Sequence, residues 1–470
     1  MIEISPSYIV VKDYKKKEGL ERYLTVWDSV YHRPSFEGFI KYKNYLILPR
    51  GIDPQVLKKH FPYKDIKKKN VKEINKLEDI EMNEEFKPRD SKQVEAIEFL
   101  NETGKFEHLN NQTQKVLSLR TGDGKTYCSI NYFINNNLIP LITVDQLSTM
   151  KQWRREITKF TTLKEENVYF IAGKDTIKEL EEESVDNNRV YVASHRTVSN
   201  LLSKDPLRFY KLIKKLNIGV KIYDEAHVEW ENILRMDSFS NVKYTLYLTA
   251  TPSRSDYKEN RVYQRMFESV PKYGLKSKYN NAYNKILMVE YDTQPDDKRE
   301  AKMKTGYGFS TNKYSDYIEN DKYDYFLDII KKLVTKMGDR KMAIIVHKNS
   351  LLLKLADSLD EEFSDKEVGT FSSVISDIEE RKKELDKDII VSTDKSFDKA
   401  IDVENLKGLI NTVPMSSKTK TEQLIGRLRE DNSIFIDMTD VGFKSTKRQQ
   451  YYRKKILKLK AKESIGKIKM

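Results

Sequence analysis

A run of small and basic residues, LSLRTGDGKTYCS at positions 117 to 129, has the composition of a loop that holds phosphate. Gly122 and Gly124 permit close backbone approach and unusual φ values, so the loop amides can point inward. An apolar segment precedes the loop and a helical pattern follows it, which adds a positive helix N-terminus. Lys125 is predicted to reach the β and γ phosphates of a nucleotide, and the Thr126 hydroxyl to ligate Mg²⁺. The remaining loop positions are Thr121 and Asp123.

This match has one departure from the full phosphate-loop pattern. That pattern has glycine where this chain has Leu119. A chance loop is the alternative interpretation, and the strand, loop and helix context disfavours it.

A second stretch, VKIYDEAH at positions 220 to 227, ends an apolar strand in two acids. Asp224 at the carboxyl end of a strand can hold Mg²⁺ through its water shell. Glu225 is placed to polarise an attacking water as general base, and His227 to link the γ-phosphate region to neighbouring loops. Alone, the motif also fits a helix cap after a strand. Because it lies about a hundred residues after the glycine loop, the pair together predicts Mg²⁺ and ATP as ligands.

Apolar strands alternate with helices through most of the chain, which predicts an α/β fold with parallel sheets covered on both faces. We expect a small basic N-terminal α+β domain over 1–85, two α/β domains over 86–272 and 273–441, and a basic helix or tail over 442–470. In the N-terminal part, SPSYIVVKD and NYLILPRG read as strands, and EGLERYLTVWDSV at 18–30 as an amphipathic helix.

The charge of the chain indicates a polyanionic partner. The formal net charge is +13, and residues 444–469 carry eleven Lys or Arg against one acid, Glu463. Lysine and arginine release counterions from nucleic acid on binding, so DNA or RNA is the natural partner. The alternative is a solvated surface that keeps the protein soluble.

The sequence lacks the features of several other kinds of site and compartment. The single cysteine, Cys128, excludes a disulfide framework and a cysteine-based zinc site. No apolar run approaches the length of a membrane span, and the first residues do not have the pattern of a signal peptide. We therefore expect a cytoplasmic protein with no membrane partner, acting as a monomer.

From about Phe86 to Asp440 the chain resembles the superfamily 2 helicases, motors with two RecA-like domains. Segments similar to their motifs occur in the expected order. They are PRDSKQ at 88–93 (Q motif), TGDGKT (motif I), LITVDQLSTMKQW at 141–153 (Ia), VASHRTV at 192–198 (Ib), DEAH (II), LTATP at 248–252 (III), IIVHKNS at 344–350 (IV), IIVSTDKSFDKAIDV at 389–403 (V) and QLIGRLR at 423–429 (VI).

The resemblance implies roles for further residues. Arg427 or Arg429 would be the arginine finger; the two lie closer together than the family pattern has them, so which one acts is left open. Motif V has Ala400 where the family has glycine. The implied set for nucleotide binding and hydrolysis adds Arg89, Gln93, Asp402 and Gln423. The implied coupling residues are His227, Thr249 and Thr251, and the implied nucleic-acid contacts are Gln152, Ser194, His195, Arg196, Lys348 and Thr393.

Within that superfamily, the layout is most similar to the UvsW-type branch-migration helicases of large tailed phages, with a T-five-like siphophage as the narrower expectation. The expected function is an ATP-dependent DNA helicase or translocase that unwinds or branch-migrates forked and four-way junctions in replication, recombination or repair. An RNA helicase and a nucleic-acid-binding scaffold with a vestigial ATP site are the alternatives. A restriction motor is a third, although no nuclease-like carboxylate cluster stands out.

Overall fold

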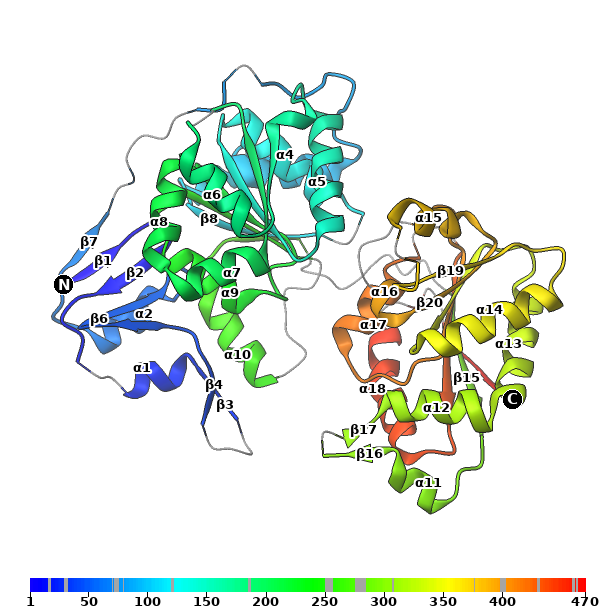
Figure 1. The fold of residues 1–470 in the computed structure, drawn as a ribbon. Helices are drawn as coiled ribbons and strands as arrows, with labels where there is room; N and C mark the ends of the chain where they lie inside the picture. Colours follow the sequence, from blue (N-terminus) through cyan, green and yellow to red (C-terminus); the bar gives the residue numbers. More distant parts are fainter. Residues whose placement is uncertain are drawn as a thin grey trace. The chain divides into compact units, whose positions relative to one another are not determined.

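The computed structural model describes the chain in two compact units, Met1–Lys276 and Ser277–Met470 (Figure 1). It describes residues 1–470 except 16–17, 29–32, 70, 72–75, 79, 120–121, 185–186, 250–256, 275–284, 307, 376, 398–402, 429–431, 459–460 and 462–463. Each unit contains one seven-stranded sheet, and each is described here by itself.

The sheet of the first unit has the strand order β10-β11-β9-β12-β13-β8-β14, and all its pairings are parallel. Most of its strands are short apolar runs buried on both faces, as expected when helices cover a parallel sheet. The strands are β8 (Gln114–Ser118), β9 (Pro140–Val144), β10 (Val168–Ile171), β11 (Val190–Ser194), β12 (Val220–Tyr223), β13 (Tyr244–Thr249) and β14 (Lys272–Gly274).

Helices cover both faces of this sheet. The strand–helix–strand connections through α4 and α5 run toward β10, and those through α6 to α9 run away from it. Because all these connections have the same handedness, α4 and α5 lie on one face of the sheet and α6 to α9 on the other (Figure 1). The helices are α3 (Ser91–Asn101), α4 (Lys125–Asn135), α5 (Leu147–Phe160), α6 (Lys174–Glu182), α7 (His195–Lys204), α8 (Pro206–Lys215), α9 (Trp230–Ser238) and α10 (Tyr257–Met266), with 3₁₀ turns at Gly104–Leu109 and Glu165–Asn167.

The N-terminal residues form a five-stranded sheet of order β5-β6-β2-β1-β7. The two predicted strands are confirmed as β2 (Tyr8–Val11) and β6 (Tyr45–Pro49). The other elements are β1 (Ile2–Ile4), β4 (Pro34–Glu37), β5 (Ile40–Tyr42), α2 (Pro54–His60) and β7 (Ile66–Lys68). This sheet is part of the first unit, because the Ser7 hydroxyl donates to the carbonyl of Val242 at 3.0 Å.

The predicted helix over 18–30 is wrong beyond its first turns. Helix α1 spans Glu18–Tyr23, and the chain then enters β3 (Thr25–Trp27), which pairs antiparallel with β4. Thr25, Val26 and Trp27 are β-branched or aromatic, which favours a strand once a partner strand is present. The Thr25 hydroxyl donates to the carbonyl of Glu21 at 2.6 Å and marks the end of the helix.

The sheet of the second unit repeats the topology of the first. Its order is β19-β20-β18-β21-β22-β15-β23, again entirely parallel, so the strands of both sheets follow the same path through their sheet. The strands are β15 (Lys285–Tyr291), β18 (Met342–Val346), β19 (Val368–Phe371), β20 (Ile389–Thr393), β21 (Gly408–Asn411), β22 (Ile434–Asp440) and β23 (Gly466–Lys469), with a small hairpin of β16 (Lys304–Thr305) and β17 (Gly308–Phe309).

The helices of the second unit pack against this sheet and bury Ile344, Leu355 and Val391 without exposure. They are α11 (Asp297–Lys302), α12 (Thr311–Asp321), α13 (Tyr323–Met337), α14 (Asn349–Glu362), α15 (Ile378–Lys383), α16 (Asp394–Phe397), α17 (Lys418–Ile425) and α18 (Lys444–Lys458), with a 3₁₀ turn at Glu384–Asp386. Tandem RecA-like parallel sheets with a small N-terminal α+β part are therefore confirmed as the fold.

The last segment of the chain is built into the second unit. Strand β23 pairs with β15, and α18 inserts Arg453, which is 1% exposed, under the sheet. Arg453 Nε donates to both carboxylate oxygens of Asp437 at 3.0 Å, and its Nη1 donates to the carbonyl of Met415 at 2.7 Å. This residue of the basic run is consequently structural.

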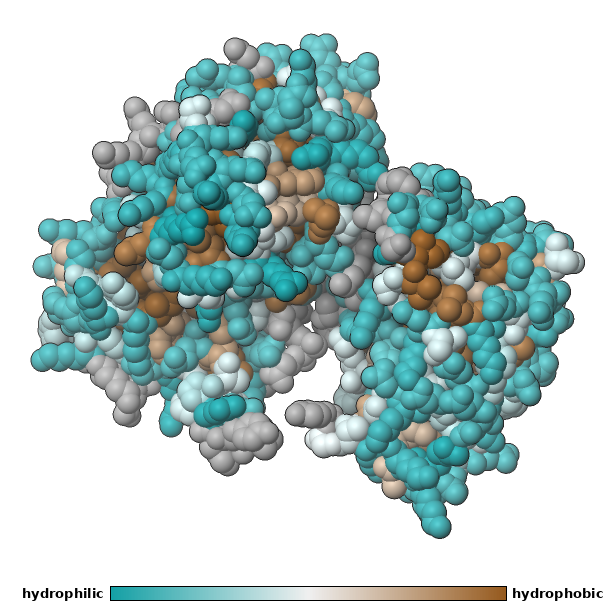
Figure 2. All heavy atoms as spheres, in the orientation of Figure 1, coloured by the Kyte–Doolittle hydropathy of each residue, from teal (hydrophilic) through white to brown (hydrophobic). Residues whose placement is uncertain are grey.

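The surface view in Figure 2 is mostly hydrophilic, with small hydrophobic groups between. Among the described residues, no helix combines the length and apolar composition needed to cross a membrane.

Candidate nucleotide and nucleic-acid sites

Three of the predicted motifs follow strands that are neighbours in the first sheet. The order β12-β13-β8 places β13 between the strand that ends in the two acids and the strand that leads into the glycine loop. Thr249 pairs with Ser118 across β13 and β8, and Tyr223 pairs with Tyr247 across β12 and β13. All three carboxyl ends therefore meet at one edge of the sheet, where parallel sheets bind ligands.

The glycine loop has the backbone that phosphate binding requires. Gly122 and Gly124 have φ values of 85° and 88°, in the region that favours glycine. Helix α4 begins at Lys125, so its N-terminal amides face the loop. Lys125 Nζ donates to the carbonyl of Leu119 at 3.1 Å, which holds the ammonium over its own loop. Thr126 and Asp123 are half-buried beside it, and Thr121 lies outside the described residues.

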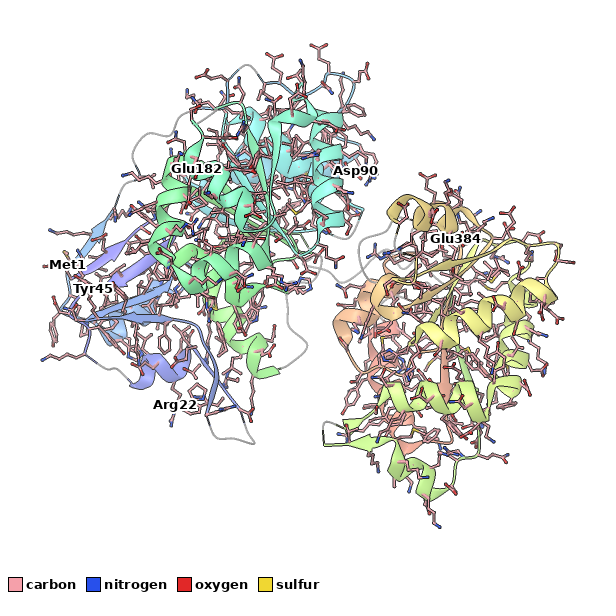
Figure 3. All side chains as sticks on the ribbon, viewed as in Figure 1. Met1, Arg22, Tyr45, Asp90, Glu182 and Glu384 are labelled. Atoms are coloured by element: carbon pink, nitrogen blue, oxygen red, sulfur yellow. The ribbon has the colours of Figure 1, made fainter. Side chains whose placement is uncertain are left out.

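The residues of the predicted Q motif contact this loop directly. The Arg89 guanidinium donates to the carbonyl of Gly122 at 3.1 Å, and Gln93 Nε2 lies 3.4 Å from the carbonyl of Asp123. Gln93 Oε1 in turn accepts from the Arg89 amide at 2.8 Å. Asp90, labelled in Figure 3, caps α3 by accepting from the Gln93 amide at 2.9 Å. The structure thus brings both side chains, Arg89 and Gln93, to the phosphate loop.

The two acids of the DEAH segment occupy distinct environments. Asp224 accepts from the indole nitrogen of Trp153 at 3.0 Å and from the Glu225 amide at 3.0 Å. Burial raises the pKa of Asp224, and the carboxylate of Glu225 adds to this, while Trp153 and Lys125 oppose it. Glu225 has a left-handed backbone with φ of 47°, which is uncommon for a residue with a Cβ.

The sequence interpretation missed the link of Trp153 to Asp224. Trp153 is 1% exposed, and its one polar atom faces the carboxylate. The signal was available in the Gln152–Trp153 pair of motif Ia, since a buried tryptophan usually finds a partner for its N–H.

A hydrogen bond connects the DEAH segment to the strand between the two motifs. Thr249 Oγ1 lies 2.9 Å from His227 Nδ1, and Glu225 Oε2 lies 3.3 Å from the same nitrogen. Thr249 and His227 are both buried, at 0% and 2% exposure. The predicted coupling residues His227 and Thr249 are therefore in contact, and Thr251 lies outside the described residues.

The predicted nucleic-acid contacts of the first unit divide into accessible and buried side chains. Arg196 is exposed and Gln152 is half-buried, so both can present polar groups to a ligand. Ser194 caps α7 by accepting from the Thr197 amide at 3.2 Å.

The prediction of a phosphate contact for His195 does not fit its position. Its ring is 2% exposed and lies parallel to the Tyr223 ring, with centroids 6.5 Å apart. Burial lowers the pKa of His195 to about 4, so the ring is neutral near pH 7 and is not a cation for phosphate. A histidine next to an arginine looks exposed in sequence, but the first turn of α7 points this one inward.

In the second unit, the predicted contact Lys348 follows β18, and the predicted contact Thr393 is the last residue of the neighbouring strand β20. The Lys348 ammonium pairs with Asp316 of α12. Thr393 is 5% exposed, and its hydroxyl accepts from the Ser396 amide at 3.2 Å, so it caps α16.

Asp394, which no motif assignment singled out, connects three elements of the second unit. It lies after β20 and accepts from His347 Nδ1, after β18, at 2.9 Å. It also accepts from Lys420 Nζ, on α17, at 3.2 Å. Helix α17 carries Gln423, and the half-buried Arg427 follows it, so Asp394 anchors the helix of motif VI. Arg429 and Asp402 lie outside the described residues.

A buried ion pair beneath the DEAH strand was also missed. Lys221 on β12 is fully buried, and its ammonium contacts the carboxylate of Asp237 and the hydroxyl of Ser7. The hydroxyls of Tyr223 and Tyr247 donate to the two oxygens of Asp237, each at 2.7 Å. Burial lowers the pKa of Lys221, and Asp237 opposes this. The alternating apolar pattern of β12 hides this lysine.

Sequence comparison finds similarity to one family model and to two curated proteins. Residues 85–254 match the family model described as type III restriction enzyme, res subunit. The transcript termination protein A18 of Yaba-like disease virus is 25% identical over 335 residues, which is 67% of this chain and 64% of that protein. The DNA 3'-5' helicase XPB of Mycobacterium tuberculosis is 28% identical over 148 residues, covering 32% of this chain and 25% of that protein.

These matches support the resemblance of the chain to the superfamily 2 helicases.

A solved structure with a similar fold supports the architecture described above. S. cerevisiae Dbp5 bound to RNA and ADP BeF3 aligns with a TM-score of 0.52 at 14% identity, covering 81% of this chain and 94% of that one. T4 UvsW aligns over 100% of this chain and 99% of that one at 16% identity, with a TM-score of 0.36. The chain spans less than two thirds of the length of the two curated relatives above.

Proposed function

We propose that this protein is an ATP-dependent DNA helicase or translocase that remodels forked and four-way junctions. The observation that carries the proposal is the convergence of Lys125, Thr249 and the Asp224–Glu225 pair at one edge of the first sheet. A vestigial site would have no reason to keep the lysine, both acids and two glycines at positive φ together.

The residues at this edge suit a nucleoside triphosphate with Mg²⁺. Thr126 and Asp224 would hold the metal, and a bound Mg²⁺ supplies charge neutralisation on the phosphates. Among the described residues no group of three or more His, Cys, Asp or Glu side chains could hold a metal. Mg²⁺ does not require one, because it keeps several waters and takes one or two carboxylates plus phosphate oxygens.

The protein's own residues would then act in distinct roles. Lys125 releases the carbonyl of Leu119 and donates to phosphate oxygen, while Glu225 accepts a proton from the attacking water. The Asp224 carboxylate is held in position by Trp153. Arg427 is the described candidate for the finger that neutralises developing charge.

The choice of DNA rests on the relative named as a DNA helicase and on the basic charge of the chain. RNA is the alternative, because Dbp5 carries RNA on the same fold. ATP turnover should therefore be measured with single-stranded DNA, with RNA of the same length and with neither. Stronger stimulation by RNA than by DNA contradicts the DNA assignment.

Two substitutions test the site itself. Lys125→Ala and Glu225→Gln should each lower ATP turnover at least 100-fold while DNA binding stays within a few-fold of wild type. Glu231→Gln, an exposed glutamate on α9, is the matched control and should turn over normally. Normal unwinding of forks by either test variant would refute the proposal. Equal ATP-dependent activity of the wild type on plain duplex and on junctions would refute the junction preference.

A further inference from the structure

The exposed face of α18 has an unusual composition. Eight residues of this helix are exposed, six of them cations and two of them tyrosines, with no acid among them. They are Lys444, Lys447, Arg448, Tyr451, Tyr452, Lys454, Lys455 and Lys458. Five of the eight repeat at alternating intervals of four and three residues, which places them in one stripe along the helix.

The opposite face of the same helix fixes its orientation. Thr446, Arg453, Ile456 and Leu457 are buried, and Arg453 is bonded to Asp437, Met415 and Thr439. Because turning the helix would break this buried ion pair, the cationic face is held outward.

Nothing in the described structure neutralises these six cations. None of them makes an ion pair with a carboxylate of the described residues, whereas Lys467 on β23 pairs with Glu290 at 2.8 Å. The nearest interaction is that of Lys455 Nζ, which lies 4.5 Å from the centroid of the Tyr451 ring. A helix of this length spans about 21 Å, so like charges are held close together without compensation. A bound polyanion would neutralise these charges.

The tyrosines distinguish nucleic acid from an acidic protein as that polyanion. Tyr451 is 59% and Tyr452 is 41% exposed, and their rings lie at 68° to each other with centroids 5.8 Å apart. Each ring therefore offers its own face to a planar group. Phosphates of one stacked strand recur about every 3.4 Å, so about six of them match the length of the helix. Bases that stack on aromatic rings must be unpaired.

We propose that the exposed face of α18 is a docking surface for single-stranded nucleic acid, whose phosphates pair with the six cations and whose bases stack on Tyr451 and Tyr452. The partner class rests on the proposed function, but the surface is separate in the chain from the motor motifs. Through this surface the protein binds a single strand independently of ATP.

Binding without nucleotide tests this surface. The test variant is Arg448→Gln/Lys455→Gln, and its control is Lys332→Gln/Lys336→Gln on α13. Binding of a labelled dT20 strand and of a labelled 20-base-pair duplex is measured by fluorescence anisotropy from 50 to 300 mM salt. The α18 variant should lower the salt slope for dT20 by about 1.4, since each lost single-strand contact removes about 0.7. The α13 variant should leave the slope at the wild-type value.

Tyr451→Leu/Tyr452→Leu tests stacking separately from charge. It should weaken dT20 binding by roughly 5- to 100-fold per lost base contact and leave duplex binding unchanged. Equal loss on dT20 and duplex would overturn the single-strand assignment. Displacement of dT20 by polyglutamate of equal charge would overturn nucleic acid as the partner.

Two controls keep this test independent of folding and of the proposed function. Unfolding curves of the α18 and α13 variants should match wild type, because every residue substituted in them is exposed. Lys125→Ala should retain the α18-dependent part of dT20 binding. If wild type lacks ATP turnover but shows that binding, only the proposed function fails; if turnover is normal and the α18 variants bind like wild type, only this inference fails.

Discussion

The Gln93 side chain fills the space that a β-carbon on Gly124 would occupy, and its amide lies 3.4 Å from the carbonyl of Asp123. Gln93 of the Q motif and the phosphate loop are thus packed against each other. A change on either side of this contact must disturb the other.

Gly124→Ala should therefore abolish ATP binding and turnover. The added carbon meets Gln93, and φ of 88° is strained for alanine, which costs on the order of 1–2 kcal/mol. Titration with a fluorescent ATP analogue measures the effect. Gly306→Ala, where no atom lies within 4 Å of the new carbon, is the control and should bind as wild type. Normal analogue binding by Gly124→Ala would show that the loop is not the nucleotide site.

Lys221→Met should lower the free energy of unfolding by about 3–5 kcal/mol, because it leaves Asp237 charged and buried without its cation. Urea unfolding followed by circular dichroism measures the loss. Adding Asp237→Asn in the same chain should recover part of it, since the uncompensated charge is then gone. Lys211→Met, on the exposed side of α8, should change stability by less than about 0.5 kcal/mol. A loss in Lys221→Met no larger than in this control would refute the buried pair.

Arg453→Met and Arg448→Met provide a matched pair on one helix. Arg453 is bonded to Asp437 and Arg448 is exposed, so the first change should destabilise the second unit by about 3–5 kcal/mol and the second by less than about 0.5 kcal/mol. Thermal unfolding compares them directly. Truncation after Phe443 is a poor test of nucleic-acid binding for the same reason, because it removes Arg453 and β23 together. Similar melting temperatures for the two variants would contradict the structural role of Arg453.

Asp394 should make stability depend on pH in the acid range. Burial alone would raise the pKa of Asp394, but His347 and Lys420 outweigh it, so the net pKa is lowered. A carboxylate whose pKa is lower when folded stabilises the protein above its unfolded value of about 3.9, and this stability is lost as pH falls through the folded value. Urea midpoints between pH 6 and pH 3 should fall less for Asp394→Asn than for wild type. Parallel pH profiles would show that the carboxylate is not linked to folding.

The positions of the glycine loop and of the two acids at strand ends could be predicted because their signals are local. Glycines before Lys125 and acids after β12 each follow a short apolar run, and parallel strands bring such ends to one edge. Both sheets were predicted for the same reason, as buried strands alternate with helical patterns throughout the two units.

What the sequence could not provide is the partner of a charged residue. Lys221 and Asp237 lie on different elements, and only the packed structure shows that they neutralise each other. Arg453 looked like one more cation of a basic run, but a helix can bury one face of such a run. The helix predicted over 18–30 failed because Thr25–Trp27 pair as β3 with β4, and the local sequence pattern does not show this pairing.

The hydrogen bond from Ser7 to Val242 joins positions 235 apart in the chain. At ribosomal rates of about 5–20 residues per second, the first strands wait tens of seconds before the surface that receives them has been made. During that time the side of β6 that contacts α9 is uncovered, although the other side packs in a cluster of the N-terminal residues themselves. The N-terminal sheet thus completes its packing late in the synthesis of the first unit, and until then this side is open to chaperones or misfolding.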